Sequence, residues 1–270
     1  MTIHTERFEH VWTIVHDRSE ARNSMDPQSA DELVAAFLEF ERDPEARVAV
    51  LWGAGGAFCA GWDLKYAATL VNLPERERDE IFAQLAFPED DAPVPRGAMG
   101  PTRLQLSKPV ITAVEGPAVA GGMELAMWCD LRVCAEDAYF GVYCRRWGVP
   151  LVDGGTLRLP RLVGQGRALE IFLTGRQVPA EEALRIGLCE KVVAPGQARA
   201  AAESLAREIG RFPQQAVRAD RRNVYATRGL VEQEALKVEW SNGVDALIEG
   251  IAGAARFSSG HGRHGDFGKI

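Results

Sequence analysis

Apolar runs alternate with amphipathic stretches along most of the chain. Residues 10–17 and 47–53 are largely apolar and predict strands. Residues 27–41 repeat apolar positions at helical spacing, and the Asp26-Pro27 pair at their start is typical of a capped helix. Residues 108–116 are mostly apolar, so we expect a strand covered on both faces.

The same alternation continues beyond this strand. The pattern predicts a helix over 123–130, a strand over 131–136, a helix ending near residue 176, a helix over 179–187 and a strand over 188–193. From Ala198 the pattern is helical and charged, apart from a glycine-rich end over 258–270. The predicted fold class is therefore α/β with a C-terminal helical region. Residues 72–100, rich in charge and then in proline, form the least regular insertion and could cover the mouth of a pocket.

The composition narrows the class of function. A chain of 270 residues with 46% hydrophobic residues can bury a sizeable core, and we expect one main domain. The net charge of −7 argues against a nucleic-acid partner, which would need clustered Lys and Arg. No apolar run reaches the roughly 18 residues of a membrane span, and the first residues lack a signal pattern. We therefore expect a cytoplasmic protein with no membrane partner.

Cysteine and histidine are poorly placed for metal binding. The five cysteines include no CxxC pair, and the five histidines lie at positions 4, 10, 16, 261 and 264, near the two ends. We expect reduced thiols, no metal site and no Ser-His-Asp triad in the body of the domain.

Two glycine-rich junctions carry the candidate chemistry. The first, GAGGAFCAGWDLK over 53–65, lacks the third glycine of a dinucleotide fingerprint and any GK[ST] phosphate loop, and alone it is consistent with a tight turn. The second, GPAVAGGMEL over 116–125, places Gly121 at a helix start, where its N–H could donate to an oxyanion. Glu124 follows in the first turn, either beside the polarised group or simply where the helix dipole favours an acid.

Together these junctions resemble the paired signatures of the crotonase superfamily, the enoyl-CoA hydratases and isomerases. The likeness extends from ARNSMD at 21–26 to EALRIGLCEKVV at 182–193 and covers most of the chain. It implies a crotonase-like spiral of ββα units over residues 1–195, which binds acyl-CoA. It also implies a C-terminal helical trimerisation region over 196–270, and hence a homotrimer or a dimer of trimers.

The resemblance also implies the catalytic groups. The backbone N–H groups of Ala60 and Gly121 form the oxyanion hole for the thioester oxygen. Glu124 aligns with the first catalytic glutamate of the hydratases, but Cys144 stands where the second is expected. Asp153 is the candidate for the missing proton-transfer group, although an aspartate before two glycines commonly bonds its own turn. A Cys144 thiolate, favoured by Arg145 or Arg146, is the alternative.

The implied substrate-binding residues are Arg22, Ala60, Gly61, Trp62, Asp63, Leu64, Gly121 and Cys144. Arg22 and Lys65 could approach CoA phosphates, or could be plain surface charge. Asp63 could brace the first loop.

The resemblance implies an acyl-CoA-processing enzyme, with enoyl-CoA hydratase as the nearest label and no cofactor beyond the coenzyme A of the substrate. An isomerase that uses one carboxylate is an alternative. The absent second glutamate also leaves open a non-catalytic acyl-CoA-binding protein. Crotonase relatives run several reactions on one scaffold, so the resemblance identifies the thioester and not the reaction.

Overall fold

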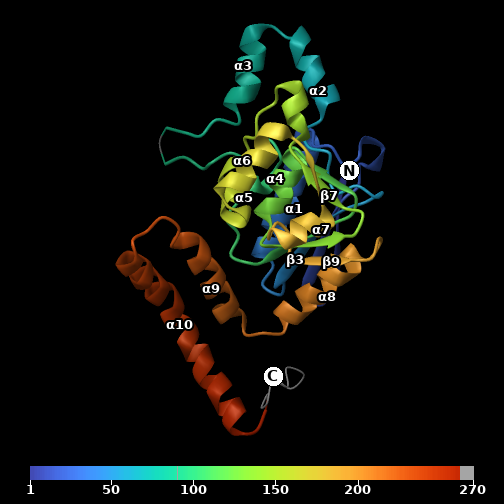
Figure 1. Cartoon of the computed structure of the whole chain (residues 1–270). Coiled ribbons are helices and arrows are strands. Elements are labelled where there is room, and N and C mark those ends of the chain that lie inside the picture. The colour runs from blue at the N-terminus through green and yellow to red at the C-terminus, as the bar shows by residue number, and fades with distance from the viewer. Residues whose placement is uncertain (90, 262–270) are drawn as a thin grey trace.

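A computed structural model describes residues 1–89 and 91–261, and its strands form two sheets (Figure 1). The larger sheet has the order β1-β2-β3-β4-β6-β9 and the smaller one the order β5-β7-β8. The strands are β1 (Ile3–Phe8), β2 (Val11–His16), β3 (Val48–Gly53), β4 (Val110–Val114), β5 (Pro117–Val119), β6 (Leu131–Ala135), β7 (Tyr139–Gly141), β8 (Gln177–Pro179) and β9 (Lys191–Val193).

The helices lie between and after these strands. They are α1 (Pro27–Arg42), α2 (Leu64–Thr69), α3 (Glu75–Ala83), α4 (Gly121–Trp128), α5 (Gly155–Val163), α6 (Gln165–Thr174), α7 (Ala180–Arg185), α8 (Ala198–Gly210), α9 (Gln214–Ala226) and α10 (Glu232–Ser258). The mixed α/β fold class predicted from the sequence is confirmed. The last part of the glycine-rich end, 262–270, lies outside the described residues.

The large sheet is parallel from β2 to β9, as its apolar strands predict. Every residue of β2 and β4 is buried, because helices cover both faces: α1 packs against β2, while α8 packs against β2, β3, β4 and β6. The start of α1 also agrees with the sequence, since the Asp26 side chain accepts a hydrogen bond from the Ser29 N–H at 2.8 Å. The strands that were not predicted are β1, an antiparallel edge strand with polar residues exposed, and the three short strands β5, β7 and β8 of the small sheet.

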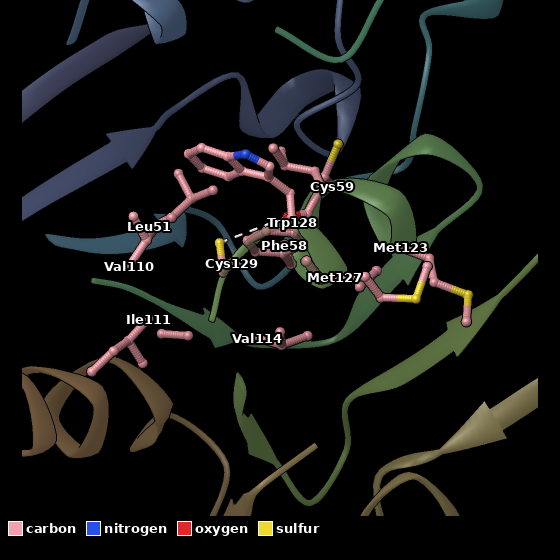
Figure 2. Packing of buried hydrophobic residues seen from close by; sticks show 14 of the residues in the cluster. Leu51, Phe58, Cys59, Val110, Ile111, Val114, Met123, Met127, Trp128 and Cys129 are labelled. Atoms are coloured by element: carbon pink, nitrogen blue, oxygen red, sulfur yellow. Dashed lines mark hydrogen bonds between the residues drawn. The ribbon is translucent and has the colours of Figure 1, made fainter. Parts of the chain in front are cut away.

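The core joins the two sheets through the segment around α4. Trp128, Phe58, Met123 and Met127 pack beside β3 and β4 in one apolar cluster (Figure 2). Trp128 meets the Phe37 ring edge-on at 4.8 Å between centroids, and its indole N–H donates to the Leu104 carbonyl at 3.0 Å. This packing fixes α4, which carries Gly121 and Glu124.

Two helical parts extend from this core on opposite sides (Figure 1). One part is the α2–α3 arm: α2 precedes the irregular insertion over 72–100, and α3 lies within it. The other part, the α9–α10 hairpin, extends from the opposite side of the core, and no residue of α10 is buried.

Among the described residues, none of the helices has the length and apolar character needed to span a membrane. Whether residues 196–270 fold as a unit separate from 1–195 stays a prediction.

Candidate active site

A cavity of about 500 Å³ lies where the two glycine-rich junctions meet the insertion. Its walls are mostly apolar, which is typical of a small-molecule site with a few placed polar groups. The lining residues are Ala60, Trp62, Leu64, Phe82, Leu85, Ala86, Ala98, Met99, Arg103, Ala120, Gly121, Glu124, Tyr143, Cys144, Trp147, Gly148, Val149, Pro150, Val152 and Asp153. The insertion therefore does help to enclose a pocket, as its irregular sequence predicted.

The two junctions, far apart in sequence, are held together by backbone pairing. Cys59 pairs with Ala118: the Cys59 N–H donates to the Pro117 carbonyl at 3.1 Å, and the Val119 N–H donates to the Cys59 carbonyl at 3.0 Å. Gly61 has φ +92°, and a Cβ there would lie 3.0 Å from the Gly121 nitrogen. Glycine at 61 is therefore needed for both its conformation and its close approach to the second junction.

The structure corrects the predicted donor in the first junction. The Ala60 N–H already donates to the Arg22 carbonyl at 3.0 Å, so it is not free to hold a substrate oxygen. The prediction that Ala60 supplies an oxyanion-hole N–H is therefore wrong. Ala60 does line the cavity, as expected for a substrate-binding residue.

In the first junction, the backbone N–H that is free to hold a substrate oxygen is that of Trp62. Met25 pairs with Trp62 through the neighbouring groups: the Met25 N–H donates to the Gly61 carbonyl at 2.7 Å, and the Asp63 N–H donates to the Met25 carbonyl at 2.9 Å. In such a bridge the N–H of the central residue points away from its partner strand. No acceptor for the Trp62 N–H is found within the described part of the chain.

Gly121 occupies the first position of α4, where the N–H has no partner inside the helix. The preceding residue, Ala120, has φ +55°, a conformation that non-glycine residues rarely adopt. This backbone geometry turns the chain into α4 beside the cavity wall formed by Ala120 and Gly121. The predicted Gly121 donor thus has the right setting, although its role stays a prediction.

Glu124 lines the cavity and is buried, with 2% of its surface exposed. One carboxyl oxygen, Oε1, accepts hydrogen bonds from the Asp153 N–H at 2.9 Å and the Gly155 N–H at 2.8 Å. Burial raises the pKa of Glu124 to about 7, and the nearby negative charge of Asp153 adds to that rise, against the two N–H donors. A group with this pKa can both give and take a proton at neutral pH.

Asp153 lies in the same wall and is 3% exposed. Its Oδ1 accepts hydrogen bonds from the Met99 N–H at 3.1 Å and from the Thr102 hydroxyl. No hydrogen bond to Oδ2 is found among residues 1–89 and 91–261. Within the described residues the Asp153 side chain therefore does not bond its own turn: it ties the end of the insertion to the loop that contacts Glu124.

Cys144 also lines the cavity, but its chemistry is not that of a thiolate. Burial raises the pKa of the Cys144 thiol, the Glu124 charge raises it further, and Arg145 offsets these effects only in part. Since the thiol is neutral near pH 7, the structure disfavours the alternative in which a Cys144 thiolate replaces the second glutamate.

The other predicted residues divide between lining and bracing. Trp62 and Leu64 line the cavity, whereas Arg22, Gly61 and Asp63 are not among the lining residues. Asp63 caps α2 and pairs with Arg18 at 2.7 Å, so it braces the loop as predicted. Burial would raise the pKa of Asp63, but the hydrogen bonds from Arg18 and the Tyr66 and Lys65 N–H groups prevail and lower it.

Sequence reasoning missed three residues that position the acids. Met99 and Thr102 hold the Asp153 side chain, while Arg158 donates to the Asp153 carbonyl at 2.6 Å and to the Thr102 carbonyl at 2.7 Å. Arg158 stands five residues after Asp153, in the first turns of α5, and nothing in its sequence setting distinguishes it from a surface arginine.

The chain is similar to known proteins over most of its length. The family model described as enoyl-CoA hydratase/isomerase matches residues 6–87 and 100–247. The chain is 35% identical over 250 residues to the enoyl-CoA hydratase EchA19 of Mycobacterium tuberculosis, covering 90% of this chain and 87% of that one. It is 38% identical over 214 residues to a carnitinyl-CoA dehydratase of Salmonella typhi, covering 77% and 74%.

Solved structures give the same result. The enoyl-CoA hydratase EchA1 of Mycobacterium marinum superposes with a TM-score of 0.83 at 32% identity, covering 96% of both chains. An enoyl-CoA hydratase of Bacillus anthracis has a TM-score of 0.83 at 30% identity, with the same coverage.

The fold and the paired glycine junctions define a crotonase-type protein. The chain belongs to the enoyl-CoA hydratase/isomerase family. The family resemblance stated from the sequence, and with it the expectation of an acyl-CoA-processing enzyme of this type, is confirmed.

Proposed function

We propose that the protein catalyses reversible hydration of an enoyl-CoA. The observation that carries the proposal is the set of groups around one cavity: two N–H donors, at Trp62 and Gly121, and a buried carboxyl, Glu124, whose pKa is raised to about 7. A thioester oxygen between the two N–H groups would develop negative charge as an enolate forms. The coenzyme A belongs to the substrate, and the reaction needs no separate cofactor.

In the forward direction, water oriented by the Asp153 carboxylate adds its oxygen to C3 of the enoyl group, while the Glu124 carboxylate takes the proton that water loses. The electron pair of the C2=C3 bond moves into the thioester, and the resulting oxyanion is held by the Trp62 and Gly121 N–H groups. The enolate then collapses and C2 receives a proton from the Glu124 carboxyl. Glu124 thus ends as it began, and the product is the 3-hydroxyacyl-CoA.

One-carboxylate isomerisation is the second candidate function. The observation that favours it is that Asp153 Oδ1 already accepts hydrogen bonds from Met99 and Thr102. Only Oδ2 is left to contact substrate or water, so Asp153 is less available for proton transfer than Glu124. In an isomerisation, Glu124 would remove a proton from one carbon and return it to another, with no addition of water.

Mass and absorbance of the products separate the two reactions. Purified protein is mixed with a short 2-enoyl-CoA and, separately, with a 3-enoyl-CoA. Hydration removes the absorbance of the conjugated thioester and adds the mass of one water, whereas isomerisation of the 3-enoyl-CoA creates that absorbance without a change in mass. Binding of both esters without either change would show that the protein is a binder, and the proposal would then be wrong.

Asp153→Asn is expected to lower kcat for hydration by at least about 10-fold, because the second carboxylate no longer orients the attacking water for Glu124. The asparagine oxygen can still accept both hydrogen bonds, so the thermal midpoint should change little. Cys144→Ala, the matched control in the same wall, should retain kcat within about threefold. If the Cys144 variant is the inactive one, the second proton-transfer group is the thiol.

We further propose a homotrimer, alone or paired into a hexamer, in which α10 forms subunit contacts. Trp240, Leu247, Ile248 and Ile251 on α10 are 65%, 56%, 72% and 72% exposed, and contiguous apolar surface of this kind is typical of a protein interface. Light scattering should give three or six times the chain mass of 29.5 kDa. Ile248→Glu should reduce that mass, and a monomeric wild type would contradict the assignment.

Residence of the protein in the cytoplasm stays a prediction.

A further inference from the structure

One positively charged side chain lines the cavity in the described part of the chain, and the proposed reaction does not use it. This is Arg103, at the end of a short 3₁₀ helix, Pro101–Arg103, that follows the insertion. Its side chain is half-buried, and most of the other residues that line the cavity are apolar. Charge in an apolar wall costs free energy unless a partner compensates it.

The guanidinium is held in place without being neutralised. Nη1 donates to the Leu85 carbonyl at 2.7 Å and to the Pro95 carbonyl at 3.5 Å, and the group stacks 4.3 Å from the Phe87 ring centroid. These contacts fix the plane of the group. Within residues 1–89 and 91–261, Arg103 forms no ion pair, and neither Nε nor Nη2 has a hydrogen-bond partner.

The backbone on both sides of Arg103 is also fixed, by hydrogen bonds to residues around the cavity. The Thr102 hydroxyl donates to Asp153, the Thr102 carbonyl accepts from Arg158 at 2.7 Å, and the Leu104 carbonyl accepts from the Trp128 indole at 3.0 Å. Arg103 therefore keeps a defined position relative to Glu124, as a substrate-recognising group requires.

Part of the wall beside Arg103 lies outside the residues that the family model matches. The enoyl-CoA hydratase/isomerase family model matches up to residue 87 and resumes at residue 100, so the segment that includes Pro95 is unmatched. Ala98 and Met99, from the same segment, line the cavity. Since the shared parts bind the thioester, an unmatched wall is where the structure would select the rest of the acyl group.

We propose that the acyl group of the substrate carries a carboxylate remote from the thioester, and that Arg103 binds it. The inference rests on the proposed function, because it assumes an acyl-CoA in this cavity. A guanidinium presents parallel N–H donors that match a carboxylate, and its free Nε and Nη2 are one such pair. A plain alkyl chain would instead cover the Nε and Nη2 donors without offering them an acceptor.

Calorimetric titration with saturated CoA esters tests the proposal without requiring turnover. The probes are matched pairs of equal chain length: succinyl-CoA with butyryl-CoA, adipyl-CoA with hexanoyl-CoA, and suberyl-CoA with octanoyl-CoA. For the pair that fits best, the wild type should bind the carboxylate-ended ester at least about 10-fold more tightly. Arg103→Met should weaken its binding by roughly 10- to 100-fold, the range expected for a hydrogen-bonded charge pair, and change the alkyl ester by less than about threefold.

Arg76→Met is the matched control, because Arg76 lies on the exposed α3 helix, pairs with Glu80 at 2.9 Å and does not line the cavity. It removes the same charge and should leave both affinities unchanged. A wild type that prefers the alkyl ester in every pair would overturn the proposal. So would an Arg103→Met variant that loses both esters equally, since Arg103 would then only brace the insertion. If no CoA ester binds to the wild type, the proposed function itself is wrong.

Discussion

Glu124→Gln is expected to lower kcat by about 100-fold or more while acyl-CoA affinity stays within a few-fold of the wild type. Glutamine keeps the shape, and its side-chain oxygen can still accept the N–H bonds of Asp153 and Gly155, so the loop should stay in place. What is lost is the group that takes a proton from water and returns one to C2. Stopped-flow turnover and calorimetric binding of the same CoA ester measure the two effects separately.

The pH dependence provides an independent check on Glu124. Burial raises its pKa to about 7, and the base form begins the hydration, so kcat/KM should fall as the pH drops through about 7. The residual activity of Glu124→Gln should lack this limb. A glutamine variant with wild-type kcat would mean that Glu124 only supports the start of α4 and the Asp153 loop.

The raised pKa of Glu124 follows from the different surroundings that the fold gives to the carboxyl groups of Glu124 and Asp153. Glu124 enters an apolar wall from α4 and receives two N–H bonds on one oxygen, which are too few to offset its burial. Gly155 allows this approach, since a Cβ at that position would lie 2.9 Å from Glu124 Cγ. Asp153 meets a backbone N–H and a hydroxyl instead. The same wall thus gives its two acids different surroundings, which is how neighbouring carboxyl groups take different roles.

Much of the fold could be predicted because its signals are local. The β2, β3 and β4 segments are continuous apolar runs, and α1 begins with a cap that the structure confirms. The edge strand β1 was missed because only Ile3 is buried in it, so no apolar alternation marks it. It is a strand because it pairs with β2, and this pairing cannot be predicted from the residues of β1 alone.

The site was predictable only where a residue type carries the chemistry. Glu124 and Asp153 stood out as acids beside glycines, and both lie in the cavity wall. The donor in the first junction is a backbone group, so every residue from Ala60 to Asp63 offers the same N–H in the sequence. Which one is free depends on pairing with Met25 and Arg22, and that appears only in three dimensions.

The oxyanion assignment leads to a second prediction of large effect, made with proline as the probe. Trp62→Pro removes the free N–H but leaves the Met25 bridge, which uses the Gly61 carbonyl and the Asp63 N–H. We expect kcat to fall by about 100- to 1,000-fold, as for the loss of one oxyanion-hole donor. Trp62→Ala keeps the N–H and removes only the indole, so its kcat should stay within about 10-fold of the wild type.

Ala60→Pro is the discriminating comparison, because the Ala60 N–H is already bound to the Arg22 carbonyl at 3.0 Å. Its loss should lower the free energy of unfolding by about 1 kcal/mol, the usual contribution of one hydrogen bond, while the folded fraction keeps its kcat. Chemical denaturation gives the stability, and circular dichroism confirms that each variant is folded before kinetics are compared. If Ala60→Pro were inactive and Trp62→Pro active, the thioester oxygen would have to displace Arg22 from Ala60. The first loop would then rearrange when substrate binds.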